Sequence, residues 1–288
     1  MKTHFNPITN KDGLIVDELF TSGHMLPGGF AQGIYEQSAT QNYTIGTRLV
    51  VDDRTFRYCK AATDLKCGYG ARQANFPREG NIAAVAYAAG TFEITIPMND
   101  HATLYASEKL ANYWAEGYIW IGQFDAKGFG PTHRIKSNTV ASGTIPTQYV
   151  TATLYEALAH DVAASAWITA HPNIYGNIQN AYHQKASVVC VPPRFITSGY
   201  YFWGQTWGPV MMQQTHAAGG LTADDREFFF HENNNGELAT GGQCDWSGAT
   251  NIKHQRAGFL LTNTTAWTNV GDGAEAGGDC FVMLQLSP

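Results

Sequence analysis

The sequence predicts a mainly β protein, an antiparallel sandwich or barrel-like domain with an extended N-terminal arm and few short helices. Only 15% of its 288 residues are charged, 12% are aromatic and 30 are glycine, so residues that favour long helices are scarce. Short segments rich in β-branched and aromatic residues recur along the chain. Gly, Pro, Asn or Asp separate them, which is the spacing typical of a sandwich or barrel.

Residues 1–45 form the predicted arm, because short apolar stretches alternate there with turn-forming residues and show no sustained periodicity. The arm is too apolar to be a solvated linker. We therefore expect its large side chains to pack on the same subunit or on a neighbouring one, and the pattern leaves both alternatives open. The interface or packing candidates in this segment are Leu19, Phe20, Leu26, Phe30 and Ile34.

Residues 46–288 are predicted to form one β-rich domain, with a division near residue 215 as an alternative. Residues 221–253 begin with a short strand and continue as a long polar stretch, so we expect a protruding loop there. Helical patterns are weak, since residues 101–117 and 155–165 are each long enough for only a few turns. Strands must therefore supply most of the core.

The first strand pair is expected at residues 46–62, where an Asp52-Asp53 turn follows an apolar strand. Phe56 and Tyr58 alternate with other side chains in the second strand of this hairpin, and both are packing candidates. Further strands are predicted at residues 91–97, 117–124, 132–137, 148–154, 165–170, 187–191, 258–263 and 280–286.

Five aromatic rings occur within the ten residues of "GYYFWGQTWG" (199–208), which could be a ligand platform or a core strand. In an extended strand, alternate side chains point to opposite faces. Aromatic rings then fall on both faces, which favours a strand buried on both sides, within the domain or at a subunit seam. The packing candidates here are Tyr200, Trp203 and Trp207.

Charge and composition argue against several classes of partner. The net charge is −6, from 24 acidic and 18 basic residues, and no basic run is longer than two, so we expect no nucleic-acid binding. No stretch approaches the roughly 18 apolar residues of a spanning helix, and the N-terminus lacks a signal-peptide pattern, so no membrane partner is expected. Five scattered cysteines indicate synthesis in a reducing cytoplasm.

No motif for catalysis or metal binding stands out. The ten histidines show no metal-ligand spacing, and neither a nucleophile elbow nor a phosphate-binding loop is present. We therefore expect no enzyme activity, no cofactor and no metal. A carbohydrate-active enzyme stays as a lesser alternative, although no spacing selects a pair of carboxylates for it.

The segment "GYYFWGQTWGP" (199–209) resembles a strand that recurs in the capsid decoration, or cement, proteins of tailed bacteriophages. Segments similar to other parts of that family follow the same order along the chain. They are residues 46–62, 114–138, 150–159, 171–178 and 280–288. The resemblance covers most of residues 46–215 and the C-terminus. The chain departs from the family before residue 45, at residues 105–115 and at residues 221–253.

The resemblance implies a virion structural protein without catalysis. It implies a β-rich subunit, a homotrimer, that is made in the host cytoplasm and sits on the exterior of a phage capsid. There it would bind the major capsid protein and clamp neighbouring capsomers, burying apolar area across their boundaries. A tail or fibre adhesin of the virion is the main alternative, because such proteins share the β-rich, aromatic composition.

Overall fold

The computed structural model describes most of the chain from residue 32 onward. The described ranges are residues 8–9, 15–16, 32–73, 78–81, 86–98, 109–122, 130–143, 148–164, 166–181, 187–213, 226–231, 236–239, 255–261 and 279–288. The fold is mainly β, with antiparallel sheets and one nearly closed, barrel-like sheet, which confirms the predicted fold class. Within these ranges, no helix is long and apolar enough to cross a bilayer.

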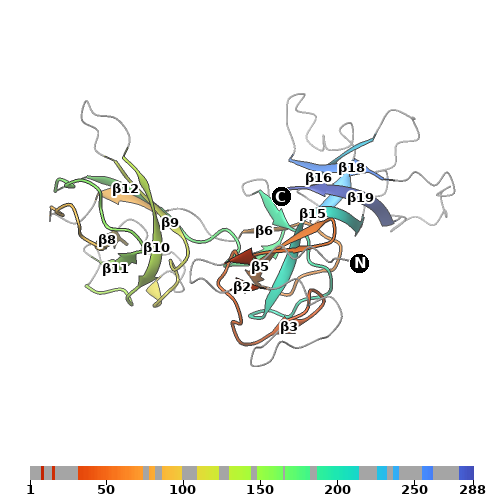
Figure 1. Ribbon diagram of the computed structural model, residues 1–288, viewed down its shortest axis with the longest axis horizontal. Coiled ribbons are helices and arrows are strands. Elements are labelled where there is room, and N and C mark those ends of the chain that lie inside the picture. The colour runs from red at the N-terminus through yellow and green to blue at the C-terminus, as the bar shows by residue number, and fades with distance from the viewer. Residues whose placement is uncertain are drawn as a thin grey trace. The chain divides into compact units, whose positions relative to one another are not determined.

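The chain divides into two compact units (Figure 1). Unit 1 combines residues 1–74 with residues 175–288, and unit 2 consists of residues 75–174. Unit 2 is therefore inserted, in sequence, within unit 1. Neither boundary was expected from the sequence, which indicated one domain from residue 46 or a division near residue 215.

The largest sheet of unit 1 joins residues from both of its segments. Its strand order is β17 (Glu237–Ala239), β16 (Glu227–His231), β18 (Arg256–Leu260), β19 (Asp279–Gln285), β15 (Tyr201–Gln213), β5 (Arg54–Lys60) and β4 (Arg48–Val51), and β3 (Gln37–Ser38) also pairs with β15. Figure 1 shows the C-terminal strands β16, β18 and β19 in blue beside β15. Because β15 pairs with β5 on one side and with β19 on the other, strands from before and after residue 215 belong to one sheet.

Strand β15 is thirteen residues long and changes partner in its middle. Its first half pairs with β5 and its second half with β19, and Trp207 is in register with both Thr55 and Gln285. The register with β5 shifts between Gln205 and Trp207, which is the irregularity of a β-bulge. Gly208 follows with a φ of 94°, a conformation that favours glycine. These features let one strand belong to both halves of the sheet.

Two smaller sheets complete unit 1. One has the order β13 (Ile178–Asn180), β6 (Ala71–Gln73), β14 (Val188–Cys190), and the other pairs β1 (Ile8–Thr9) with β2 (Ile15–Val16). One apolar cluster of the unit contains Phe56, Tyr58 and Trp203, and a second contains Phe228 and Leu284. Within residues 221–253, the predicted short strand is β16, and β17 pairs with it where the polar loop was expected. Most of the predicted loop lies outside the described residues.

Unit 2 is the nearly closed barrel. Its strand order is β7 (Arg78–Asn81), β12 (Trp167–His171), β9 (Tyr118–Gly122), β10 (Thr132–Asn138), β11 (Tyr149–Leu154) and β8 (Glu93–Pro97). The two end strands, β7 and β8, also contact each other. Side chains alternate in burial along β8, β11 and β12, and aliphatic residues such as Ile96 and Ile119 fill the interior, as expected for a small barrel.

The short helices expected in this region are absent from its described residues. Lys109 is in a 3₁₀ conformation, and residues 110–117 form bends and turns, in which Asn112 and Glu116 adopt φ values of 60° and 65° that a right-handed helix excludes. Trp114 is buried there, whereas Leu110 is exposed. Residues 155–164 are also turns, and Val162 forms a β-bridge with Tyr87. The helix predictions were therefore wrong for residues 110–117 and 155–164, while residues 101–108 and 165 lie outside the described residues. The apolar residues Trp114, Leu158 and Val162 of these segments pack into the core of unit 2 without a helix.

Candidate interaction surface

The described base of the N-terminal arm packs on its own unit. Ile34 is buried, and β3 forms backbone pairs with Tyr201 and Phe202 of β15. Buried Gln32 donates from Nε2 to the carbonyl oxygen of Tyr201 at 2.8 Å. This base therefore follows the same-subunit alternative. The other four arm candidates, Leu19, Phe20, Leu26 and Phe30, lie outside the described residues.

The aromatic candidates Phe56, Tyr58 and Trp203 are completely buried. The ring centroid of Tyr58 lies 5.0 Å from that of Trp203 and 5.2 Å from that of Tyr43, in edge-to-face geometry. Burial raises the pKa of the Tyr58 phenol above its usual value. Tyr200 is half-buried and packs against the same cluster. The first half of the aromatic stretch is thus core.

Gln32 satisfies the polar atoms of these rings. Its side-chain oxygen accepts the hydroxyl proton of Tyr58 at 2.8 Å, and its backbone carbonyl accepts the indole N–H of Trp203 at 2.9 Å. Buried polar atoms that are already paired offer a ligand little. The cluster is therefore a packing site, as the alternation of the stretch indicated.

The second half of β15 presents apolar side chains to solvent. Directly opposite residues of an antiparallel pair face the same side, and Met211 is opposite Phe281 while Pro209 is opposite Met283. Met283 is in turn opposite Phe259 on β18. Of these side chains, Met211 is 48% exposed, Phe281 41% and Phe259 36%. These residues form one continuous outer surface across three strands.

We call this surface the Met211–Phe281 face. It consists of Trp207, Pro209, Met211, Phe259, Leu261, Phe281 and Met283. Leu261 is 37% exposed and its backbone N–H donates to the carbonyl oxygen of Phe281 at 3.0 Å, which fixes the end of β18 against β19. Trp207, the last of the predicted candidates, is half-buried at the end of the face next to Gln285.

The opposite side of the same strands is a second core. Met212, Val282 and Leu284 are buried there against Phe228 and Phe230. Met211, Phe259, Phe281 and Met283 are not part of that core, and three of them are exposed. Methionine and aromatic side chains are enriched at the centres of protein interfaces, and soluble monomers rarely expose large contiguous apolar patches. The face therefore has the chemistry of a protein-binding surface.

Charged and polar groups border this face. Arg256 and Glu227 form an exposed ion pair, with 3.2 Å between Nη2 and Oε1, and Glu227 is in register with Phe259. Gln285 lies at the end near Trp207. An apolar centre with a polar edge is the usual anatomy of a protein interface.

Most residues of this face were not among the sequence candidates. The strands at residues 258–263 and 280–286 were expected, but apolar residues on both faces were predicted only for the stretch 199–208. The signal was available, because "CFVMLQL" (280–286) also places apolar residues at both odd and even positions. The same pattern therefore has two outcomes. The first half of β15 is buried on both sides, whereas β18 and β19 each have one exposed side.

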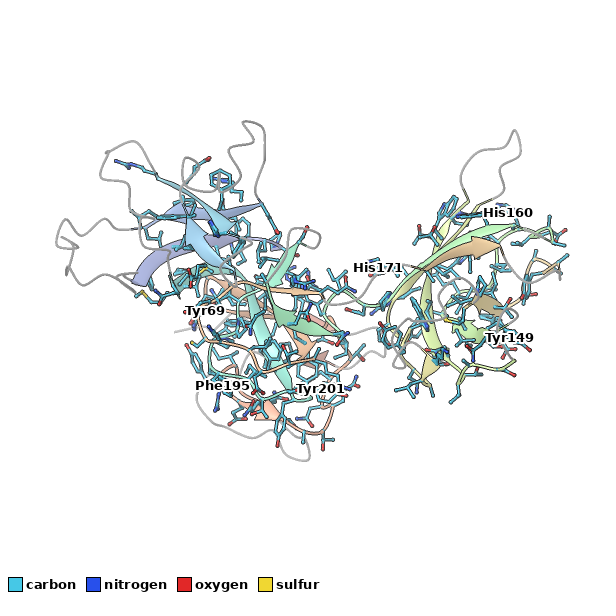
Figure 2. The ribbon with its side chains drawn as sticks, turned by 180° about the vertical axis from the view of Figure 1, so that it is seen from behind. Tyr69, Tyr149, His160, His171, Phe195 and Tyr201 are labelled. Atoms are coloured by element: carbon cyan, nitrogen blue, oxygen red, sulfur yellow. The ribbon has the colours of Figure 1, made fainter. Side chains whose placement is uncertain are left out.

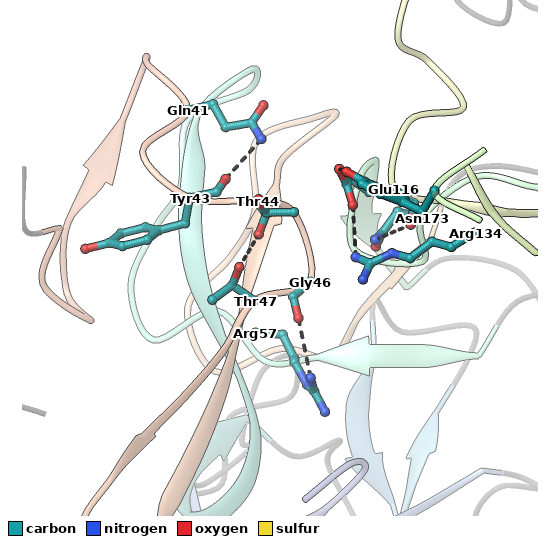
Figure 3. Close-up of polar contacts among 10 residues, drawn as sticks. Gln41, Tyr43, Thr44, Gly46, Thr47, Arg57, Glu116, Arg134 and Asn173 are labelled. Carbon is teal, nitrogen blue, oxygen red and sulfur yellow. Dashed lines mark hydrogen bonds and ion pairs between the residues drawn. The ribbon is translucent and has the colours of Figure 1, made fainter. Parts of the chain in front are cut away.

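Unit 2 contains a polar cluster around Glu116, drawn in Figure 3. Its Oε2 atom lies 2.9 Å from Nη2 of Arg134, and its backbone carbonyl accepts from Nδ2 of Asn173 at 2.9 Å. Its Oε1 atom accepts the hydroxyl proton of Tyr155 at 2.8 Å. Both carboxylate oxygens therefore bind groups of unit 2. This arrangement ties the turn before β9 to β10, to the end of β11 and to the segment after β12.

The described ranges contain no group of three or more His, Cys, Asp or Glu side chains that could hold a metal ion. Among the described hydrogen bonds, none joins His160 to Asp161, and Oδ1 of Asp161 accepts the backbone N–H of Ala89 at 2.8 Å.

Comparisons with protein-family models, with curated proteins and with solved structures found no match for this chain. The Met211–Phe281 face is thus the feature that carries the functional argument.

Proposed function

We propose that this chain is a virion structural protein that binds the outside of a phage capsid and clamps neighbouring capsomers. The observation that carries the proposal is the Met211–Phe281 face, an exposed apolar surface on strands whose other side forms a buried core. The resemblance of residues 199–209 and of the segments in order with them to capsid decoration proteins supports the same function. On that resemblance we also propose a homotrimer that contacts the major capsid protein.

The energetics of such a clamp fit an apolar face. Burial of apolar area contributes about 25 cal/mol per Å², so each 100 Å² covered by a capsid subunit contributes roughly 2.5 kcal/mol before the costs of association. The same contact repeats at every copy over a closed shell. A net charge of −6 also limits attraction to the packaged genome.

The test uses empty heads assembled from the major capsid protein of the phage that encodes this chain. Purified protein is added, the heads are sedimented, and bound protein is quantified. We expect the wild-type chain to co-sediment and the double variant Met211→Ser/Phe281→Ser to lose at least tenfold in affinity. Phe195→Ser is the matched control, because Phe195 is 52% exposed and lies at the far end of unit 1 from β18 and β19 (Figure 2).

Two outcomes are informative in opposite ways. A wild-type chain that does not bind heads contradicts the capsid function. A double variant that binds as tightly as wild type is consistent with the capsid function but shows that the Met211–Phe281 face is not the contact. Circular dichroism of each variant checks that the fold is retained.

A tail or fibre adhesin is the second candidate, and one observation in unit 2 favours it. The outer side of β9 presents Tyr118, which is 47% exposed, and Trp120, and the opposite residues on β12 are His171 and Thr169. Gly122 leaves room for the indole of Trp120, because a Cβ atom there would collide with the ring. Aromatic rings beside polar groups suit glycan binding. Binding of this chain to host cells that lack phage heads would favour the adhesin.

A further inference from the structure

Two buried cysteines of unit 1 lie in contact. Cys59 is on β5 of the large sheet and Cys190 is on β14 of the three-stranded sheet, and their Sγ atoms are 3.9 Å apart. Both side chains are completely buried, and both are thiols in this structure. The pair thus joins two sheets that share no other cysteine contact among the described residues.

Gly204 of β15 creates the space for the two sulfur atoms. A Cβ atom at this position would lie 2.7 Å from Sγ of Cys190, which is closer than Cβ atoms approach other side chains, and 3.1 Å from Sγ of Cys59, which is a tight contact. Backbone bonds hold both cysteines beside Gly204: Cys59 is in register with Phe202, and Val191 exchanges hydrogen bonds of 2.8 and 2.9 Å with Gln205. The sulfur contact therefore follows from backbone geometry on both sides.

The two cysteines lie on either side of unit 2 in the sequence. Residues 75–174 fall entirely between positions 59 and 190. A bond between the two sulfur atoms would close a covalent loop that contains the whole of unit 2. It would fix the strand before the insertion to the strand after it.

We infer that Cys59 and Cys190 are a disulfide-forming pair, oxidised by a peroxide or by a small-molecule disulfide. With hydrogen peroxide, one thiolate attacks an oxygen atom, and a sulfenic acid and water form. The second sulfur then attacks the sulfenic sulfur, the S–S bond forms and a second water leaves. Two thiols and one peroxide thus give one disulfide and two waters. With a small-molecule disulfide, one thiolate displaces one small thiol to form a mixed disulfide, and the second thiolate displaces the other small thiol as the S–S bond forms. The sulfur atoms need only move from 3.9 Å to about 2.05 Å.

The surroundings of Cys59 make this reaction slow at neutral pH. Burial, and next the neighbouring thiol of Cys190, raise the pKa of the Cys59 thiol well above its usual value. The thiolate is the reactive form, so little of it is present in the closed fold. The two thiols should stay reduced in a reducing cytoplasm. Outside it they should oxidise to the disulfide over hours and not seconds. This inference does not depend on the proposed capsid function.

The experiment uses the full chain with Cys67, Cys244 and Cys280 changed to Ser, so that only the pair remains. The folded protein is incubated with hydrogen peroxide or oxidised glutathione at pH 7 and at pH 9. It is then denatured, treated with N-ethylmaleimide and analysed by mass spectrometry. We expect a product that has lost two hydrogens and takes up no maleimide, formed faster at pH 9. A peptide joining residues 59 and 190, reversible by dithiothreitol, identifies the bond.

The same background with Cys190→Ser is the control, and it should take up one maleimide and form no internal crosslink. The oxidised pair should also unfold at a higher temperature than the reduced pair, because the crosslink restricts the unfolded chain. Two maleimides per chain after prolonged oxidation, or sulfinic acid without a crosslink, would overturn the inference. If the triple serine variant does not fold, peptide mapping of the oxidised wild-type chain gives the same readout.

Discussion

Trp203 and Trp207 lie four residues apart on β15 and belong to different environments. Trp203 is completely buried and donates its indole N–H to the backbone carbonyl of Gln32 at 2.9 Å. Trp207 is half-buried beside Gln285, at the end of the exposed Met211–Phe281 face. The bulge between Gln205 and Trp207 separates the two. One aromatic stretch therefore contributes to a core and to a surface.

The two tryptophans should differ in their effect on stability. Trp203→Ala removes a large buried side chain and is expected to cost about 3–5 kcal/mol in the free energy of unfolding. Trp207→Ala should cost roughly half as much or less, because part of that side chain is already solvated. Urea denaturation followed by circular dichroism measures both values. Equal losses would contradict the different burial of the two residues.

Gln32 should stabilise the packing of the base of the N-terminal arm on unit 1. Its side chain bonds to the Tyr58 hydroxyl, the Asn42 side chain and the backbone carbonyls of Glu36 and Tyr201. Gln32→Ala leaves several of these groups unpaired and is expected to cost about 2–3 kcal/mol. Limited proteolysis should also cut the variant faster near residue 40.

Gln41 is the matched control for Gln32. Its side chain is exposed and donates to the carbonyl oxygen of Tyr43 at 3.0 Å (Figure 3). Gln41→Ala should change stability by about 0.5 kcal/mol or less. Similar losses for the two alanine variants would show that the burial of Gln32 has no energetic role.

His133 should make unit 2 sensitive to acid. It is buried on β10 opposite Ile119, and burial lowers its pKa, an effect that the charge of Glu156 partly opposes. The folded chain therefore binds a proton less readily than the unfolded chain, so stability is retained above about pH 6.5 and decreases below it. Thermal melts between pH 5 and pH 8 should show this decrease.

A substitution of His133 should reduce that dependence. His133→Leu removes the titrating group from an apolar interior, so its melting temperature should vary less between pH 5 and pH 7 than that of wild type. His160→Asn is the control, since His160 is exposed. The hypothesis fails if His133→Leu and wild type show the same slope.

At position 116, a glycine variant should be more stable than an alanine variant, which is the reverse of the usual order. Its φ of 65° is strained for a residue with a Cβ atom, and its carboxylate binds Arg134 and Tyr155. Glu116→Ala loses the carboxylate bonds and keeps the strain, at an expected cost of about 1.5–3 kcal/mol. Glu116→Gly relieves the strain and should be about 1 kcal/mol more stable than Glu116→Ala. A glycine variant less stable than the alanine variant would contradict the left-handed conformation.

Much of the strand content could be predicted from local patterns. Period-two alternation places strands close to β8, β10 and β11, whose inward residues include Ile94, Ile135 and Val150. The hairpin at residues 46–62 also followed from a local pattern, although β5 is buried on both sides, with Cys59 as buried as Phe56 and Tyr58. These features depend on neighbouring residues only, so a single sequence contains them.

The arrangement of the strands could not be predicted in the same way. The insertion of unit 2 depends on β15 pairing with β5 more than 140 residues earlier in the chain, and no local pattern specifies such a pairing. The exposed face depends on which side of β19 the core occupies, and Phe281 and Val282 look equally suited to either side. The contact between Cys59 and Cys190 likewise requires two sheets to meet.

Cryo-electron microscopy of heads reconstituted with this chain is the most direct test of the capsid proposal. The expected map has regular extra density over the whole outer surface of the head. In that density β15, β18 and β19 lie with Met211, Phe259 and Phe281 against the capsid protein. A head surface without added density, or density confined to the tail of complete virions, would contradict the proposal.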